Sequence, residues 1–328
     1  MGVMRMMEYG SIADIQKPVA RLILGTMIIS TSERDRSYRL LDDAFETGFT
    51  ALDTAHVYAG GDSERCIGDW MRDRANRDRV VIVSKGAHPN ADRKRLTPYD
   101  IGADLLDSLA RLKTDHIDLY LLHRDDLAVP VGEIVDALDE HRRAGRIHAY
   151  GGSNWTHNRL AEANEYARIH NRGQMVASSP NYSLAEQVLD PWGENSGSVT
   201  LSGPENGDAR AWYEKTQIPV LAWSSLARGF FAGRFTSKDF TERKNLLDGA
   251  ATRAYIHETN LLRLDRAFTL AAEKDISVAQ IAMAYVIHSP MNVFPIVGAA
   301  NRTELEANLA SMQTALTEEE RAWLNLEV

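Results

Sequence analysis

Short apolar runs rich in valine, isoleucine and leucine alternate along the chain with longer segments whose apolar residues recur every three to four positions. A short run bounded by turn residues is typical of a buried strand, and the longer spacing is typical of an amphipathic helix. Strands are predicted at residues 22–24, 51–52, 80–83, 117–122, 147–150, 175–177, 220–222 and 293–296. Helices are predicted at residues 32–47, 63–74, 98–111, 132–144, 156–169, 208–216, 261–274, 278–288 and 303–311.

Eight strands that alternate with helices predict the α/β fold class, as a (β/α)8 TIM barrel in one domain of residues 1–328. The alternative, a doubly wound dinucleotide-binding sheet, requires a glycine-rich turn after its first strand. Gly25-Thr26-Met27 is not such a turn. Residues 1–20 are expected to form an N-terminal hairpin or extension at the barrel bottom, and residues 312–328 a C-terminal tail helix.

Several residues mark where the predicted helices begin and end. Thr97-Pro98 places a capping hydroxyl before a proline at the first helical position, and Thr303 is expected to cap the helix that follows it. Gly48 and Gly145 follow charged helix ends, which is typical of C-terminal caps.

Two long segments interrupt the alternation, at residues 183–208 after the sixth strand and 230–253 after the seventh. Loops longer than about 12–15 residues are commonly lids, binding loops or disordered segments. Because both segments follow strands at the predicted catalytic face, we expect lids, with plain surface excursions as the alternative.

Composition narrows the function classes. The 328-residue chain has 44% hydrophobic and 25% charged residues and a formal net charge of −9, which argues against nucleic acid or an anionic membrane surface as a partner. Its single cysteine, Cys66, excludes an internal disulfide framework and a cysteine-based zinc cluster. The start of the sequence lacks a signal-peptide pattern, and no apolar run is long enough to span a membrane. A cytoplasmic location is therefore expected.

Four polar residues stand at or just beyond the ends of predicted strands: Asp53, Tyr58, Lys85 and His123. In a (β/α)8 barrel the C-terminal strand ends form the active site, so these side chains are expected to meet there. Each of them alone has an ordinary explanation, such as a loop carboxylate, a packing tyrosine, a solvated lysine or a core histidine. Together at strand ends they indicate acid–base chemistry.

The chemistry expected of this set is proton donation to a carbonyl oxygen. An ammonium beside a phenol stabilises the phenolate, so Lys85 is expected to lower the pKa of Tyr58, with Asp53 holding Lys85 in an ion pair. A neutral His123 imidazole would orient the carbonyl group. No side chain carries a hydride, so a cofactor must supply it.

The four residues resemble the catalytic tetrad of the aldo-keto reductase family, and the resemblance extends from Arg21 to about Ser311, with the short C-terminal tail of a bacterial branch. Residues 48–55, GFTALDTA, are similar to the family's strand that leads to the catalytic aspartate. The resemblance implies a nicotinamide cofactor held by Thr26, Met27, Asp53, Ser153, Asn154, Ser179, Trp223, Ser224, Ser225, Leu226, Arg228, Gly229, Gly298, Arg302, Glu304 and Asn308.

Within that set the resemblance assigns separate roles. Ser153-Asn154 would bind the carboxamide, Trp223 would stack on the nicotinamide in place of the usual tyrosine, and the residues after Trp223 would wrap the pyrophosphate. Ser179 stands where many relatives have glutamine. Arg302 would read a 2′-phosphate, whereas Glu304 would repel one. NADP(H) is therefore the expected cofactor, with NAD(H) as the alternative.

The resemblance also suggests a substrate site and a reaction. Substrate-binding candidates are Val57, Tyr58, His123, Arg124, Trp155 and Trp192, with Met27, His56 and Trp212 as further wall residues. The expected enzyme is an NADP(H)-dependent oxidoreductase that acts on an aldehyde or ketone or on the matching alcohol, with a sugar or polyol as a candidate substrate. No metal is implied, and an oligomer is neither indicated nor excluded.

Three alternatives stay open from the sequence. The first is an NAD(H)-dependent sugar or polyol dehydrogenase of the same family. The second is a cofactor-binding regulatory subunit that resembles potassium channel β subunits, which also keep the tetrad; no partner-binding segment precedes the first strand here, so this is less expected. The third is a lyase or isomerase on the same barrel. It does not explain why Ser153-Asn154 and Trp223 occupy the positions where the family binds nicotinamide.

Overall fold

The computed structural model describes residues 6–194 and 196–328. Its fold class is the (β/α)8 barrel that the alternation of strands and helices predicts. The described residues divide into two compact units, one made of residues 6–179 and 298–305, the other of residues 180–297 and 306–328. The two units are described separately below, and the single-domain organisation stays a prediction.

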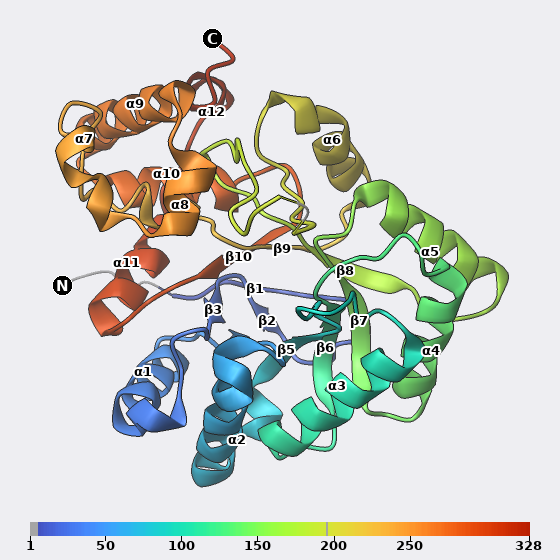
Figure 1. Cartoon of the computed structure of the whole chain (residues 1–328). Helices are drawn as coiled ribbons and strands as arrows, with labels where there is room; N and C mark the ends of the chain where they lie inside the picture. Colours follow the sequence, from blue (N-terminus) through green and yellow to red (C-terminus); the bar gives the residue numbers. More distant parts are fainter. Residues whose placement is uncertain (1–5, 195) are drawn as a thin grey trace. The chain divides into compact units, whose positions relative to one another are not determined.

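The first unit contains six parallel strands in sequence order. They are β3 (Ile23–Gly25), β4 (Ala51–Asp53), β5 (Val81–Gly86), β6 (Ile117–Leu122), β7 (Ile147–Ser153) and β8 (Met175–Ser179). Their residues are almost all buried, as expected for parallel strands that are covered on both faces. The helices between them are α1 (Arg34–Glu46), α2 (Asp62–Arg74), α3 (Pro98–Leu112), α4 (Val131–Arg143) and α5 (His157–Ile169). Figure 1 shows α2 to α5 on the outer side of these strands.

Most of the predicted helix ends are confirmed. The Thr97 hydroxyl accepts a hydrogen bond from the Asp100 amide at the start of α3. Gly48 and Gly145 follow α1 and α4 with φ angles of +98° and +72°, where a side chain would be strained. The prediction for Thr303 is wrong: α11 (Arg302–Ser311) begins one residue earlier, and the Asn301 side chain accepts from the Glu304 amide instead.

The N-terminal segment forms the predicted hairpin. Strands β1 (Tyr9–Gly10) and β2 (Val19–Ala20) pair antiparallel, while residues 1–5 of the predicted extension lie outside the described part. Lys17, between the two strands, lies 2.6 Å from the Asp118 carboxylate near the N-terminal end of β6. The hairpin therefore lies at the end of β6 where the barrel bottom was predicted.

The second unit contains the parallel strands β9 (Val220–Ala222) and β10 (Val293–Val297). Its helices are α6 (Gly207–Thr216), α7 (Phe240–Arg243), α8 (Gly249–Tyr255), α9 (Glu258–Lys274), α10 (Val278–Ile287) and the predicted tail helix α12 (Glu318–Leu324). Helix α11 crosses from one unit into the other. No helix in the described part of the chain is long and apolar enough to cross a membrane.

The two long segments of the second unit have internal order. In the first, the Asp190 carboxylate accepts hydrogen bonds from the Ser196 and Ser198 hydroxyls and from the Trp192 amide. The second holds the short helices α7 and α8, which the apolar pattern does not predict. The Asp248 side chain caps α8 by accepting from the Ala251 amide. Such a cap fixes a helix too short to be recognised by periodicity.

Candidate active site

The four residues of the predicted tetrad lie together in the first unit. Asp53 ends β4, Tyr58 follows in the next loop, Lys85 is the penultimate residue of β5, and His123 comes directly after β6. Asp53 pairs in register with Val83, two residues before Lys85. Because the three strands are parallel neighbours, their C-terminal ends bring these side chains to one edge.

Lys85 is the centre of the tetrad. Its ammonium lies 2.6 Å from the Asp53 carboxylate and donates hydrogen bonds to the Tyr58 hydroxyl at 3.2 Å and the Thr54 carbonyl at 2.9 Å. The Lys85 and Asp53 side chains are only 3% and 4% exposed. Water screens a buried ion pair poorly, so Asp53 fixes the ammonium strongly in place next to the phenol.

The protonation states differ in part from the sequence-based expectation. Burial raises the pKa of Tyr58, and the opposing charge of Lys85 does not cancel that effect, so the net direction is upward rather than downward. For Lys85 burial alone would lower the pKa, but the charges and hydrogen bonds of Asp53 and Tyr58 raise it overall. Both groups therefore keep their protons at neutral pH, and the phenol is a hydrogen-bond donor.

His123 completes the tetrad as a neutral imidazole. Its ring meets the Tyr58 ring edge to face, with centroids 5.9 Å apart. Burial, followed by the positive charges of Lys85 and Arg124 and by His88, holds the pKa of His123 well below its usual value. Its Nδ1 atom has no hydrogen-bond partner among the described residues. A neutral ring that can donate one hydrogen bond agrees with the expected carbonyl-orienting role.

His88 is a site residue that sequence reasoning missed. Its ring lies 4.7 Å from the His123 ring, centroid to centroid, in an edge-to-face contact. Its Nδ1 atom is 2.7 Å from the Pro89 carbonyl oxygen, and burial lowers its pKa. The available signal was its position three residues beyond Lys85, just past the end of β5, where a polar residue in a barrel faces the active site.

Gly86 follows Lys85 at a position where a side chain does not fit. A Cβ atom at this position would lie 1.8 Å from the Tyr120 hydroxyl oxygen and 3.0 Å from the Asp104 side chain. The next amide, of Ala87, donates a hydrogen bond to the Asp104 carboxylate. The chain beyond Lys85 is therefore fixed against β6 and α3 at close range.

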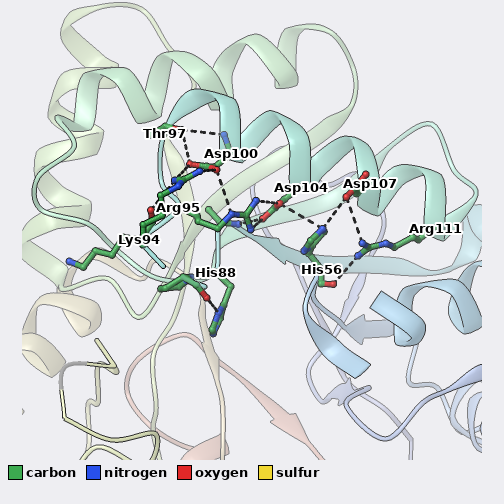
Figure 2. A network of polar contacts seen from close by, with 12 residues as sticks. His56, His88, Lys94, Arg95, Thr97, Asp100, Asp104, Asp107 and Arg111 are labelled. Carbon is green, nitrogen blue, oxygen red and sulfur yellow. Dashed lines mark hydrogen bonds and ion pairs between the residues drawn. The ribbon is translucent and has the colours of Figure 1, made fainter. Parts of the chain in front are cut away.

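Helix α3 carries a row of acidic residues that contact the loops after β4 and β5, as Figure 2 shows. Asp100, Asp104 and Asp107 recur at helical spacing, so they share one face of α3. Asp104 lies 2.5 Å from Arg95 in the loop after β5, and Asp107 lies 3.3 Å from His56, two residues before Tyr58. His56, predicted as a wall residue of the substrate site, is therefore held in place by α3. This network was not predicted from the sequence.

The residues predicted around the tetrad have different surroundings. The Thr26 hydroxyl is buried and donates to the Asp53 carbonyl at 2.9 Å, so it supports the end of β4. Met27 is 55% and Val57 36% exposed, as contact residues require. Arg124 is buried and donates to the His123 carbonyl at 2.9 Å.

Trp155, a predicted wall residue of the substrate site, is completely buried, and a Cβ atom on Gly152 would meet its ring at 2.5 Å. The Arg159 guanidinium lies over the ring at 5.6 Å. Trp155 therefore packs behind the end of β7, and its contact with a substrate stays a prediction.

The carboxamide-binding candidates lie at paired strand ends. Ser153 ends β7 and pairs in register with Ser179, which ends β8. The Ser153 hydroxyl and the Asn154 amide both donate to the Ser179 carbonyl, at 3.0 and 3.1 Å. The Asn154 side-chain amide donates to the His123 carbonyl at 3.2 Å. The structure thus brings these three residues together, close to the tetrad.

Arg302 and Glu304, the residues predicted to read or repel a 2′-phosphate, contact acidic and backbone groups in the first unit. Arg302 forms ion pairs with Asp43 at 3.3 Å and Glu46 at 2.8 Å, both on α1. The Glu304 carboxylate accepts from the Ala300 amide. A Cβ atom on Gly298 would meet no atom within 4 Å, so that position is open. A 2′-phosphate would have to compete with two carboxylates for Arg302.

The second unit carries the remaining candidates. Trp223 follows β9, and its half-buried indole has no hydrogen-bond partner for Nε1 among the described residues. The Ser225 hydroxyl donates to the Ala222 carbonyl. Left-handed backbone recurs from Ser224 onward, with φ +54° there, +49° at Ala227, +53° at Arg228 and +89° at Gly229. This conformation costs roughly 1–2 kcal/mol per non-glycine residue, and such strain gathers at functional sites.

Arg228 holds this turn against a long loop. Its guanidinium lies 2.5 Å from the Asp248 carboxylate and 4.9 Å above the ring of Trp192. Trp192, predicted to bind substrate, is 46% exposed and in this structure stacks on Arg228. Leu226 is half-buried in the same turn, and Asn308 is buried in α11.

Comparison with known proteins shows the family to which this chain belongs. The aldo/keto reductase family model matches residues 21–325. Among curated proteins, the uncharacterized oxidoreductase YrpG of Bacillus subtilis is 28% identical over 97% of this chain and 95% of its own length. The aldo-keto reductase YhdN of the same organism is 28% identical over 92% of this chain and 87% of its own length. Norsolorinic acid reductase stcV of Emericella nidulans is 25% identical over 92% of this chain and 76% of its own length.

A solved structure gives the same assignment. The thermostable aldo-keto reductase Tm1743, crystallised with the inhibitor epalrestat, superposes with a TM-score of 0.72 at 25% identity, covering 98% of this chain and 99% of its own. Relatives of this kind are oxidoreductases that act on carbonyls and alcohols. This chain, with its (β/α)8 fold, belongs to the aldo/keto reductase family and is an oxidoreductase.

Proposed function

We propose that this protein reduces the carbonyl group of an aldehyde or ketone with NADP(H), with Tyr58 as the proton donor. The observation that carries the proposal is the position of Lys85, in contact with both the Asp53 carboxylate and the Tyr58 hydroxyl. An alkoxide that forms near Tyr58 needs a proton, and the adjacent ammonium stabilises the phenolate left behind. The neutral His123 ring orients the carbonyl oxygen by a hydrogen bond.

The chain offers groups that fit a nicotinamide dinucleotide. Ser153, Asn154 and Ser179 supply hydroxyl and amide groups beside His123, as an amide-bearing ring requires. The half-buried Trp223 ring supplies an aromatic face, and the left-handed turn 227–229 supplies backbone amides with Arg228 for a diphosphate. When bound, this cofactor would supply or accept the hydride.

Membership of the family supports a nicotinamide cofactor but not a choice between its two forms. We favour NADP(H) on the presence of Arg302, with NAD(H) as the alternative. The ion pairs of Arg302 with Asp43 and Glu46 weigh against a strong preference, because a 2′-phosphate must compete with them.

The proposed substrate is a small carbonyl compound, with sugars and polyols as candidates. A relative named putative aryl-alcohol dehydrogenase, from Saccharomyces cerevisiae, points toward aromatic compounds as a second class. We therefore propose that a substrate screen include sugar aldehydes, aromatic aldehydes and aromatic ketones side by side.

Titration with NADPH and NADH, followed by quenching of tryptophan emission, tests the cofactor first. Saturable binding of either form with turnover of any screened carbonyl supports the proposal. Comparison with a Trp223→Phe variant assigns the quenching signal to the indole proposed to stack on the nicotinamide. Absence of binding of both forms to the wild-type protein overturns the assignment of Ser153, Trp223 and Arg302.

A further inference from the structure

Two histidines and an aspartate meet at the end of β6 and β7 opposite to the tetrad. His116 immediately precedes β6, Asp118 is the second residue of β6, and His148 is the second residue of β7. Ile117 pairs in register with Ile147, so the three residues are neighbours across the two strands. Because a strand rises about 3.3 Å per residue, this cluster lies roughly 20 Å along the sheet from His123.

The donor atoms of this cluster are close together, and its two histidines line a cavity. One ligand-type atom from each of His116, Asp118 and His148 lies within 4.8 Å of the other two. The two imidazole rings stack with centroids 4.4 Å apart and an angle of 20° between their planes. Both histidines line a cavity of about 490 Å³, together with Lys17 from the N-terminal hairpin. An ion or small ligand therefore has room to enter.

The Asp118 carboxylate is fully buried and needs a positive partner. Its Oδ2 atom accepts from the Ile82 amide at 2.8 Å and lies 2.9 Å from Arg77. Its Oδ1 atom accepts no well-aligned hydrogen bond among the described residues, and its ion-pair partner is the Lys17 ammonium at 2.6 Å. Oδ1 also lies 3.9 Å from Nδ1 of His148. One carboxylate oxygen is therefore oriented by fixed groups, and the other faces a lysine and an imidazole.

We propose that His116, Asp118 and His148 bind a divalent transition-metal cation such as Zn²⁺, and that Lys17 neutralises Asp118 when the metal is absent. Two imidazoles and one carboxylate are a common ligand set for such ions, and three protein ligands leave a coordination position for water. Hard cations such as Mg²⁺ prefer an all-oxygen set, which this cluster does not provide.

Lys17 is suited to leave when a metal enters. Its ammonium lies 2.6 Å from Asp118 Oδ1, the oxygen that a metal would use, so metal and ammonium compete for one position. Its side chain is 21% exposed and has a flexible stem, so the ammonium can turn into the cavity and solvent. Arg77 would stay on Oδ2 and orient the carboxylate, as groups behind metal ligands commonly do.

Isothermal titration of the full-length protein with ZnCl₂ tests the site. Binding of one Zn²⁺ per chain is expected, and His116→Ala and His148→Ala should each weaken it at least tenfold. His170→Ala is the matched control, because His170 is exposed, stacks on Tyr166 and is not among the residues that line the cavity. The Zn²⁺ affinity of this variant should equal that of the wild type. No binding, or equal affinity in all four proteins, overturns the proposal.

Lys17 provides a test in the opposite direction. Lys17→Met removes the competing ammonium and keeps an apolar stem, so Zn²⁺ affinity should rise at least tenfold. Unchanged or weaker binding by the folded variant contradicts the proposed exchange. Co²⁺ absorption of the wild-type protein supplies a readout that needs no variant at position 17. Visible ligand-field bands that disappear in His148→Ala support the site, and their absence in the wild type overturns it.

Discussion

The Nζ atom of Lys85 donates a hydrogen bond to the hydroxyl of Tyr58 across 3.2 Å, from a position fixed by the Asp53 carboxylate. The phenol and the ammonium therefore share one buried electrostatic environment. Burial works against ionisation of the phenol, while the ammonium works for it. The pair keeps the proton on Tyr58 until an acceptor stronger than water arrives, which is what a proton donor to an alkoxide must do.

Replacement of Tyr58 by phenylalanine removes the proton donor and little else. The rate of carbonyl reduction should fall by several orders of magnitude, while the affinity for the nicotinamide cofactor stays within about twofold, because no cofactor contact is assigned to the hydroxyl. Steady-state kinetics and fluorescence titration measure the two effects. Turnover equal to the wild type would remove Tyr58 from the role of acid.

Replacement of Lys85 by methionine should cost both activity and stability. It leaves the Asp53 carboxylate buried without its cation, which costs about 3–5 kcal/mol of unfolding free energy. The double variant Lys85→Met with Asp53→Asn should recover much of that stability but none of the activity. Urea unfolding measures the stability of each variant, and initial rates measure its activity. Recovery of activity in the double variant would show that the ammonium is not needed.

The depressed pKa of His123 makes stability depend on pH. In the unfolded chain a histidine takes up its proton near pH 6.5, whereas the folded protein, by burial and by Lys85, holds this one neutral to lower pH. Between those two values the unfolded state binds more protons, so the unfolding free energy falls as the pH falls below about 6.5. His123→Gln should show a shallower decline between pH 7 and 5 in urea unfolding. Identical slopes would show that His123 has the same pKa in the folded and the unfolded protein.

Two variants test whether Arg302 contributes to the choice between NADPH and NADH, one at Arg302 itself and one at an ion-pair partner. Arg302→Ala should weaken NADPH far more than NADH if the guanidinium reads the 2′-phosphate. Glu46→Gln removes one competing carboxylate, so it should tighten NADPH about two- to fivefold, the worth of an exposed ion pair, and leave NADH unchanged. Equal changes for both cofactors in both variants would place the discrimination elsewhere.

Gly86→Ala tests the close contact between β5 and β6. The added Cβ atom would lie 1.8 Å from the Tyr120 hydroxyl oxygen, so the variant should lose about 1–3 kcal/mol of unfolding free energy and part of its turnover. Tyr120→Phe should be nearly neutral alone, because that hydroxyl has no hydrogen-bond partner among the described residues. In the double variant Gly86→Ala with Tyr120→Phe, most of the lost unfolding free energy should be recovered. If the double variant is as unstable as Gly86→Ala alone, the lost free energy comes from the backbone at position 86 and not from contact with the Tyr120 hydroxyl.

The strands could be predicted from the sequence because buried parallel strands are continuous apolar runs. Strands β6 and β9 have the predicted bounds. Strands β5, β7 and β8 continue two to three residues further, through polar and glycine residues that end in Gly86, Ser153 and Ser179. An apolar pattern cannot follow a strand into the active site, because there the side chains serve chemistry while the backbone still pairs.

The tetrad could be predicted because three neighbouring strand ends, with the loop after β4, place four side chains at one edge. The surroundings of the other candidates could not. The ion pairs of Arg302 join residues more than 250 positions apart, and the packing of Trp155 against Gly152 depends on local side-chain direction. The net pKa direction of Tyr58 also depended on burial, which cannot be read from the identity of its neighbours.

All four tetrad residues lie between Asp53 and His123, within one compact unit and within the first half of the chain. The charges that shift their pKa values come from the same unit, from Asp53 to Arg124. In evolutionary terms, recombination or insertion downstream of Ser179 would leave the proton chemistry intact while it altered the long loops and the turn after β9. Chimeras that exchange this downstream part among relatives are thus a direct route to new specificities from one inherited acid–base centre.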